Sequence, residues 1–283
     1  MNEDERQGLA LLSRNVRERI LSFATDGGCF LGASLSCADL LVFLYGRWLH
    51  YPSPRDPERD LLFLSKGHDV PALYATLAEL GHLDPVRLGH HLEPGLGIYW
   101  HPHRRVPGVE FHSGSLGHLP SVAIGVACDL KLRRSQRRVV VVLGDGELDE
   151  GSVWEAFLVA AAWKLDNLWF LVDRNGFQAN GTTEQILPLE PLEAKLSAFG
   201  LHVSQADGHD FSGLADAFGS EALQGGRPHA VVARTARGKG IPSIENRADR
   251  WFCNFTREEI AELREELRGG AAARLETEAL VVR

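Results

Sequence analysis

The chain has 283 residues, of which 44% are hydrophobic and 24% charged, a composition typical of an ordinary globular protein. Its net charge of -8 argues against a general nucleic-acid binder, and the basic run from Arg133 to Arg138 is interpreted as the solvated end of a helix. No apolar run approaches the ~20 residues that span a bilayer, so we expect no membrane partner. The start of the chain does not resemble a signal peptide, and no two cysteines have C-x-x-C spacing. We therefore expect a cytoplasmic protein with free thiols.

Helices alternate with loops in the first part of the chain. Apolar residues at helical spacing predict helices within 4–24, 37–49 and 71–80, and residues 61–64 form a short apolar run between the last two. The segment 89–117 is rich in His, Gly and Pro and lacks periodicity, so we predict a long ordered loop. Long loops in compact domains are often functional.

Strands and helices alternate in the second part of the chain. Two buried, β-branched or aromatic runs, RRVVVVLGDG and NLWFLVD, flank a helix at 152–163. Further elements are predicted as strands at 202–206 and 229–234 and helices at 192–199 and 211–223. This alternation predicts an α/β fold, a mostly parallel sheet with helices on both faces, which we take as one domain over 1–283. Such sheets bind ligands at the carboxyl ends of their strands.

Polar motifs follow the two buried strands. The first ends in Gly144-Asp145-Gly146, and the second is followed by Asn175 within D-R-N-G-F. Adjacent parallel strands would place these ends side by side, where carboxylate, amide and diphosphate oxygens could build an octahedral Mg²⁺ site. Taken alone, G-D-G is only a common turn. Followed by a helix, a strand and D-x-N, it is the signature of thiamine-diphosphate enzymes.

Most of the chain, from about Gly28 to Trp251, resembles transketolases. The resemblance rests on these segments, which occur in the family's order: SKGHDVPALYATLAELG, HPHRRVPGVEFHSGSLGH, GDGELDEGSVWEA, VDRNGFQANGTTEQ, DGHD and RGKGIPSIEN. The length resembles the N-terminal subunit of two-subunit transketolases. The resemblance implies a thiamine-diphosphate-binding domain with thiamine diphosphate and Mg²⁺ as cofactors, and transfer of a two-carbon ketol unit from a ketose to an aldehyde.

The resemblance also implies a metal and diphosphate set. Asp145 and Asn175 match the side-chain metal ligands, and Phe177 would add its backbone carbonyl. Gly144 and Gly146 would lie against the diphosphate, because glycine lets the backbone approach closely.

Four further residues match the region around the reacting rings. His68 resembles the histidine that contacts diphosphate and substrate, and His101 the one that binds the donor's hydroxyketone end. Gly114 and Leu116 resemble residues lining the aminopyrimidine and thiazolium. As an alternative, His68 could simply cap the helix that follows it.

Two acids match carboxylates that link paired active sites across a subunit interface in transketolases. They are Glu150 and Glu155 in GDGELDEGSVWEA. The alternative is a helix N-terminus that favours negative side chains. In this family a glutamate also activates the cofactor, and we cannot place it in this chain. We therefore expect a separate partner resembling the C-terminal, pyrimidine-binding half, a heterotetramer of two chains of each kind, and little activity without that partner.

The sequence departs from the family at two positions where transketolases usually have histidine and this chain has Phe30 and Phe252. Phenyl rings remove hydrogen bonds and make the substrate channel more apolar, so we expect a changed donor or acceptor. A two-carbon acyl transfer or ligation with a pyruvate donor or carrier-thiol acceptor stays open. So does a non-catalytic cofactor-binding subunit, although the intact metal motif counts against it.

Overall fold

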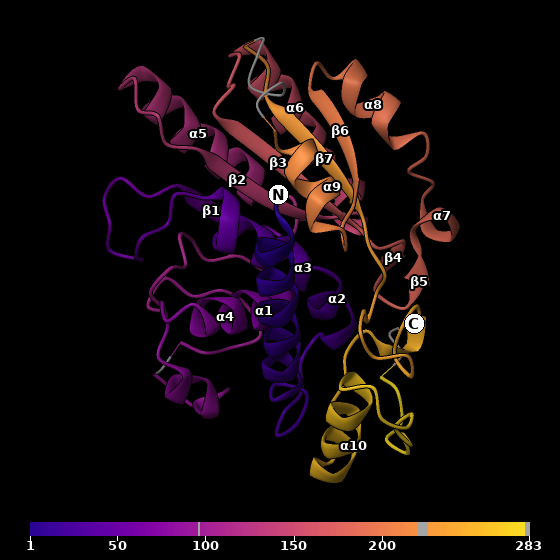
Figure 1. Cartoon of the computed structure of the whole chain (residues 1–283). Helices are drawn as coiled ribbons and strands as arrows, with labels where there is room; N and C mark the ends of the chain where they lie inside the picture. Colours follow the sequence, from indigo (N-terminus) through magenta and orange to yellow (C-terminus); the bar gives the residue numbers. More distant parts are fainter. Residues whose placement is uncertain (96, 220–225, 281–283) are drawn as a thin grey trace.

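A five-stranded sheet forms the centre of the computed structural model, which describes residues 1–95, 97–219 and 226–280 (Figure 1). Every neighbouring pair of strands is parallel, in the order β1-β2-β3-β7-β6. The strands are β1 Leu61–Leu64, β2 Val139–Gly144, β3 Leu168–Arg174, β6 His202–Asp207 and β7 His229–Arg234. The predicted α/β fold is thus confirmed, and the run at 61–64 is an edge strand.

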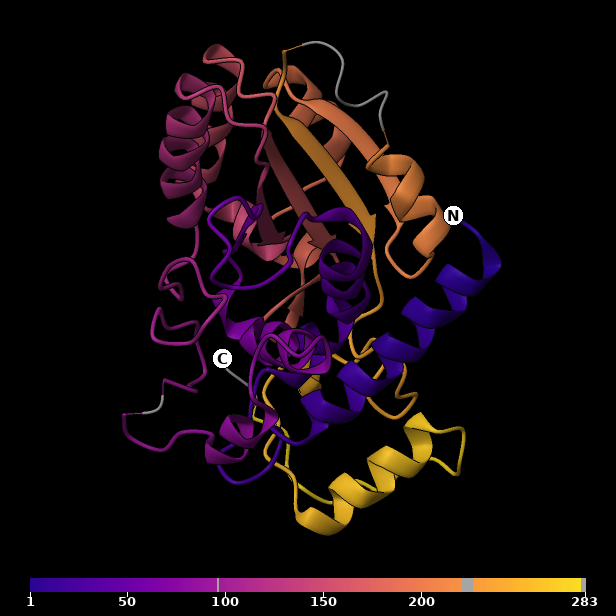
Figure 2. The same ribbon diagram turned by 60° about the vertical axis from the view of Figure 1, so that its left-hand side comes forward.

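Helices cover both faces of the sheet because alternate strand residues enter two separate cores. Helices α5, α6 and α8 pack on one face, whereas α1 to α4 and α9 pack on the other, with α10 against α1 (Figures 1 and 2). Their bounds are α1 Glu3–Leu21, α2 Leu31–Ser36, α3 Ala38–Phe43, α4 Val70–Glu79, α5 Leu119–Leu132, α6 Gly151–Ala162, α7 Thr183–Ile186, α8 Leu192–Ala198, α9 Phe211–Ala217 and α10 Arg257–Leu267.

Several elements differ from the sequence-based predictions. The helix predicted over 37–49 is α3 followed by a π-helix at Leu44–Trp48, and the fully buried α2 before it was missed because six buried residues show no periodicity. The helix predicted over 211–223 ends at Ala217, and its positions 220–223 lie outside the described residues. Helix α10 was also missed, although Thr256 and Glu259 form a capping box at its start.

Two backbone bridges bring distant parts of the chain together. Cys29 and Cys253 pair in an antiparallel bridge with reciprocal N–H···O distances of 3.0 and 2.9 Å. Phe252 in turn bridges Leu280, so the segment after α10 returns to the segment before it. The predicted loop is present: a 3-10 helix at Pro85–His90 is followed by irregular backbone at 91–95 and 97–118, the described residues before α5.

Within the described ranges, no helix combines the length and the hydropathy needed to cross a membrane.

Candidate active site

A cavity of 370 Å³ opens at the carboxyl ends of β2 and β3, where Gly144 pairs in register with Asp173. The two polar motifs therefore do lie side by side. The cavity brings together nine residues predicted from the sequence: His68, His101, Gly114, Leu116, Gly144, Asp145, Gly146, Asn175 and Phe177. Glu150 and Glu155 are exposed and lie outside its lining.

Asp145 is the buried carboxylate at the end of β2, with 1% of its surface exposed. Its Oδ1 accepts from the N–H of Gly146 at 2.9 Å, and its Oδ2 accepts from the N–H of Gly176 at 2.6 Å and from Arg174 at 3.0 Å. Burial, with Asp173 nearby, raises the pKa of Asp145 to about 6. A divalent cation at this carboxylate would relieve the cost of its buried charge.

Asn175 is held beside Asp145 by bonds at both ends of its amide. Its Nδ2 donates to Asp173 at 3.1 Å, and its Oδ1 accepts from the N–H of Phe177 at 3.0 Å. Hard oxygen donors from a carboxylate and an amide are the ligand types that Mg²⁺ takes in proteins. The residues present thus fit a Mg²⁺ ion and a diphosphate placed over Gly144 and Gly146.

Arg237 is a site residue that the sequence analysis missed, although it lies in the quoted RGKGIPSIEN segment. It is 1% exposed, and its guanidinium lies 5.1 Å from the centre of the Phe177 ring. Nη1 donates to the carbonyl of Ala179 at 2.6 Å, whereas Nε and Nη2 have no acceptor among the described residues. Burial lowers the pKa of Arg237 to about 10, so it stays charged near neutrality. A buried cation with free donors fits an anionic diphosphate.

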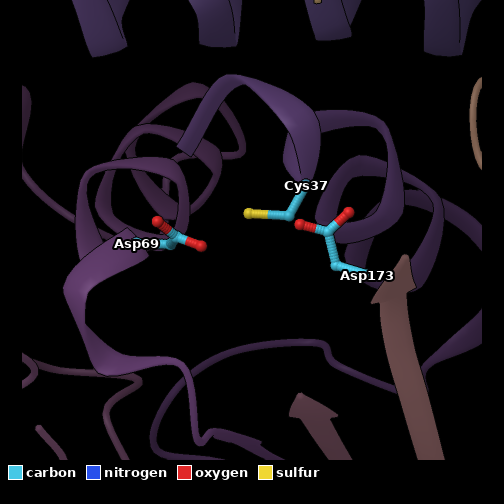
Figure 3. A group of neighbouring side chains, drawn as sticks. All are labelled: Cys37, Asp69 and Asp173. Atoms are coloured by element: carbon cyan, nitrogen blue, oxygen red, sulfur yellow. The ribbon is translucent and has the colours of Figure 1, made fainter. Parts of the chain in front are cut away.

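A second buried cluster lies beneath the cavity and has the spacing of a metal site. Cys37, Asp69 and Asp173 point toward one another from three different segments (Figure 3). The ammonium of Lys66, however, pairs with Asp173 and with Asp69, the latter at 2.6 Å. Burial opposes the charge of Lys66, but these two acids raise its pKa well above the usual value. Since burial also raises the pKa of the Cys37 thiol, we interpret the cluster as a filled ion-pair network that ties S-K-G-H to β3.

Glu147 joins three cavity-forming segments and was also missed by the sequence analysis. Its Oε1 accepts from the N–H of Gly117 at 2.9 Å and from the hydroxyl of Ser65 at 2.5 Å, and its Oε2 accepts from the N–H of Gly144 at 3.3 Å. Burial raises the pKa of Glu147. The carboxylate thus fixes the S-G-S-L-G loop against the end of β2.

The two predicted histidines meet the cavity from different loops. His68 lies in a 3-10 helix at Gly67–Asp69, and helix α4 after it has no side-chain cap, so the capping alternative is not observed. His101 lies against Gly114, where an added Cβ would come within 2.9 Å of the imidazole Cδ2. Burial lowers the pKa of both histidines, which favours neutral rings at pH 7.

Comparison with known proteins identifies the family. Residues 19–277 match the family model described as transketolase, thiamine diphosphate binding domain. The chain belongs to the transketolase family.

Relatives in this family include shorter and longer chains. The chain is 40% identical over 244 residues to one of the subunits of the apulose-4-phosphate transketolase from Actinobacillus succinogenes, covering 84% of this chain and 87% of that protein. It is 38% identical over 244 residues to a 6-deoxy-6-sulfo-D-fructose transketolase subunit of a Clostridium species, covering 83% of this chain and 88% of that protein. The solved transketolase of Campylobacter jejuni superposes with a TM-score of 0.83 at 26% identity, covering 95% of this chain but 43% of that one.

An aromatic wall, which we define as Phe30, Trp251 and Phe252, borders this cavity; Phe30 and Trp251 line it, and Phe252 packs against Phe30. The Phe30 ring is the hub, with ring-centre distances of 4.9 Å to Trp251 and 5.2 Å to Phe252. It also contacts both histidines, at 5.5 Å from His68 and 6.1 Å from His101. The sequence analysis singled out Phe30 and Phe252 but not Trp251. The bridge between Cys29 and Cys253 brings Trp251 and Phe252 to Phe30.

Proposed function

We propose that this chain is the thiamine-diphosphate-binding subunit of a two-subunit transketolase, which transfers a two-carbon ketol unit between a ketose donor and an aldehyde acceptor. The observation that carries the proposal is the convergence of Asp145, Asn175 and Arg237 in one cavity of a transketolase-family domain, where Nε and Nη2 of Arg237 have no acceptor among the described residues. Relatives of similar length are named as transketolase subunits, which supports the division into two chains.

The polar side of the cavity is proposed to hold the cofactor. Asp145 and Asn175, with the carbonyl of Phe177, would bind Mg²⁺. Arg237 and the backbone at Gly144 and Gly146 would hold the diphosphate. Position 146 has no room for a larger residue, because an added Cβ would come within 2.8 Å of the Gln178 side chain.

The opposite side is proposed to position the substrate. When bound, thiamine diphosphate supplies an electron sink for breaking and forming carbon–carbon bonds. Neutral His68 and His101 can each donate and accept a hydrogen bond, which suits the hydroxyl and carbonyl groups of a ketol unit. Gly114 and Leu116 would line the rings of the cofactor.

An apolar face on α6 supports a partner subunit. Leu158 and Trp163 are 55% and 54% exposed, and Val159 lies beside them on the same helix. Glu155 lies on this face, and Glu150 is the N-cap of the helix, which supports an interface role for both acids. Exposed apolar clusters of this kind commonly mark protein interfaces. We propose that a pyrimidine-binding subunit docks here, in a heterotetramer, and that the complex is cytoplasmic.

Turnover by the chain alone and by a co-purified complex tests this function. With thiamine diphosphate, Mg²⁺, xylulose 5-phosphate and ribose 5-phosphate, we expect the chain to bind cofactor but to turn over only with its partner. Full turnover without a partner would contradict the two-subunit proposal. Because the aromatic wall could also suit a less hydroxylated donor, pyruvate is tested beside the sugar phosphates. Preferential use of pyruvate would favour acyl transfer instead.

A further inference from the structure

The two sides of the cavity offer a substrate different chemistry. The residues proposed to hold metal and diphosphate line one part of the cavity, whereas Phe30 and Trp251, with the two histidines that contact the Phe30 ring, line another. Among the described lining residues, the cations are Lys66 and Arg237. Lys66 pairs with Asp69 and Asp173, and Arg237 lies over Phe177. The phenyl and indole rings of Phe30 and Trp251 themselves carry no charge and offer a substrate an apolar surface.

The wall is held rigidly in place. Gly28 lies behind it with a φ of +74°, and an added Cβ there would come within 2.8 Å of the Phe252 ring. The carbonyl of Gly28 accepts from the indole of Trp100 at 2.9 Å, and the Trp100 ring contacts that of Phe252. Phe30 packs nearly edge-on against Phe252, at 79°. These contacts leave Phe30 little room to move away from a polar ligand.

A rigid apolar surface discriminates against hydroxyl groups. A hydroxyl pressed against a phenyl ring loses its bond to water and gains no replacement, whereas a methyl or methylene group gains contact area. In ketol transfer, the part of the donor beyond the transferred two carbons leaves as an aldehyde, and the acceptor aldehyde enters by the reverse of that path. One wall therefore acts on both substrates.

We propose that Phe30 and Trp251 are specificity-determining residues, which select an aldehyde whose carbons next to the carbonyl carry hydrogen or alkyl groups instead of hydroxyl groups. Phe252 positions Phe30 from behind. This inference rests on the proposed transketolase function and names the substrate class of the same site.

Competition between two matched acceptors tests the inference. Propanal and D-glyceraldehyde share a three-carbon skeleton and differ in two hydroxyl groups. Hydroxypyruvate serves as the donor for the co-purified complex loaded with thiamine diphosphate and Mg²⁺. The bond to its carboxylate breaks and releases CO₂, the hydroxyacetyl unit bonds to the aldehyde carbon, and the aldehyde oxygen takes up one proton.

We expect the wild-type complex to prefer propanal in kcat/KM by about 10-fold, a typical discrimination by an apolar pocket. Phe30→His should shift the preference toward D-glyceraldehyde, because imidazole can bond a hydroxyl, whereas Phe30→Leu should retain the preference for propanal. Phe111→His, at an exposed ring outside the cavity, is the matched control and should leave the ratio unchanged.

Three results would overturn the inference. The first is a wild-type complex that uses D-glyceraldehyde as well as propanal. The second is a Phe30→His complex that binds cofactor and keeps the wild-type ratio; if this variant does not fold, loss of the preference in Phe30→Leu is the equivalent result. The third, no turnover of either aldehyde by a complex with bound cofactor, removes the proposed function itself. Cofactor binding is measured separately, by calorimetry, so the failures are distinguishable.

Discussion

The cavity has a polar floor and an aromatic wall, and the two are built in different ways. The floor, defined as Asp145, Asn175 and Arg237, takes its first two residues from the ends of adjacent parallel strands. The wall joins Phe30 to Trp251 and Phe252 through a bridge between distant segments. Buried charges can be kept only where partners or ligands compensate them, so the floor tolerates little change. The wall needs only shape and apolarity, and its rings can vary with the substrate.

Loss of the floor's carboxylate should have the largest effect. Asp145→Asn removes the charge that a divalent cation would meet, and we expect cofactor affinity in the presence of Mg²⁺ to fall by about 100-fold or more. Isothermal titration of the chain with thiamine diphosphate and Mg²⁺ measures it. Asp216→Asn, at an exposed acid on α9, is the control. Wild-type affinity in Asp145→Asn would remove the metal site from the floor.

The cationic part of the floor should matter next. Arg237→Gln leaves the diphosphate without a charged donor, and we expect cofactor binding to weaken by about 10- to 100-fold. Arg234→Gln is the matched control, because Arg234 ends the preceding strand β7, is exposed and pairs with Glu193 at 3.0 Å. If both variants bind cofactor equally well, Arg237 is not a diphosphate ligand.

Glu147 connects the loop at Gly117 to the end of strand β2, beside the floor of the cavity. Glu147→Ala should release the loop at Gly117, and we expect kcat to fall by about 10-fold with a smaller change in cofactor affinity, because misplaced groups lose rate more than binding. Glu147→Gln should restore part of the rate, since the amide oxygen can still accept hydrogen bonds. Asp149→Ala, in the same turn, is compared in parallel. An equal loss of rate in Glu147→Gln and Glu147→Ala would argue against positioning.

The smallest effect, on the stability of the fold, is expected at Glu259. This residue fixes the segment before Leu280, which bridges Phe252. Its carboxylate accepts from the N–H groups of Glu276 and Thr277, both at 2.8 Å, and from the Thr277 hydroxyl at 2.5 Å. Burial opposes the charge, but bonds from Thr277 and the backbone lower the pKa of Glu259 from 4.5 to about 2. A carboxyl with a lowered folded-state pKa stabilises the fold above its unfolded pKa, and this stability is lost as the pH falls toward the folded value.

Glu259→Gln should therefore lower the free energy of unfolding by about 1–2 kcal/mol at pH 7. The difference in the free energy of unfolding between Glu259→Gln and wild type should stay constant above about pH 5 and shrink below about pH 4.5. Urea denaturation across this range measures it, with Glu258→Gln at the exposed neighbour as the control. A difference that does not depend on pH would mean that the charge of Glu259 contributes nothing.

The fold and the two strand-end residues of the floor, Asp145 and Asn175, could be predicted because their signals are local. The apolar runs of β2 and β3 and the polar residues that follow each strand lie close together in sequence, so spacing alone brings Asp145 near Asn175. Arg237 could not be found this way, because its role depends on burial and on donors that lack acceptors. Glu147 was hidden for a similar reason: three of its partners are backbone or hydroxyl groups that leave no pattern in the sequence.

The sequence indicated two residues of the wall but not the contact between them. Phe30 and Phe252 stood out against the family's histidines, but nothing in the residues between them indicates that they touch. That contact depends on the pairing of Cys29 with Cys253 and on the glycine at position 28. The bridge between Phe252 and Leu280 likewise depends on tertiary packing.

The bridge between Cys29 and Cys253 joins a segment made early in translation to one made late. A nascent chain that has emerged as far as Asn175 already carries both proposed metal-ligand side chains, whereas Phe30 still lacks the rings of Trp251 and Phe252. Until Trp251 leaves the ribosome, the apolar surface around Phe30 has nothing from that segment to cover it. Surfaces of this kind are what chaperones bind during synthesis. The residues that we propose to set specificity thus also make the last part of the cavity to mature.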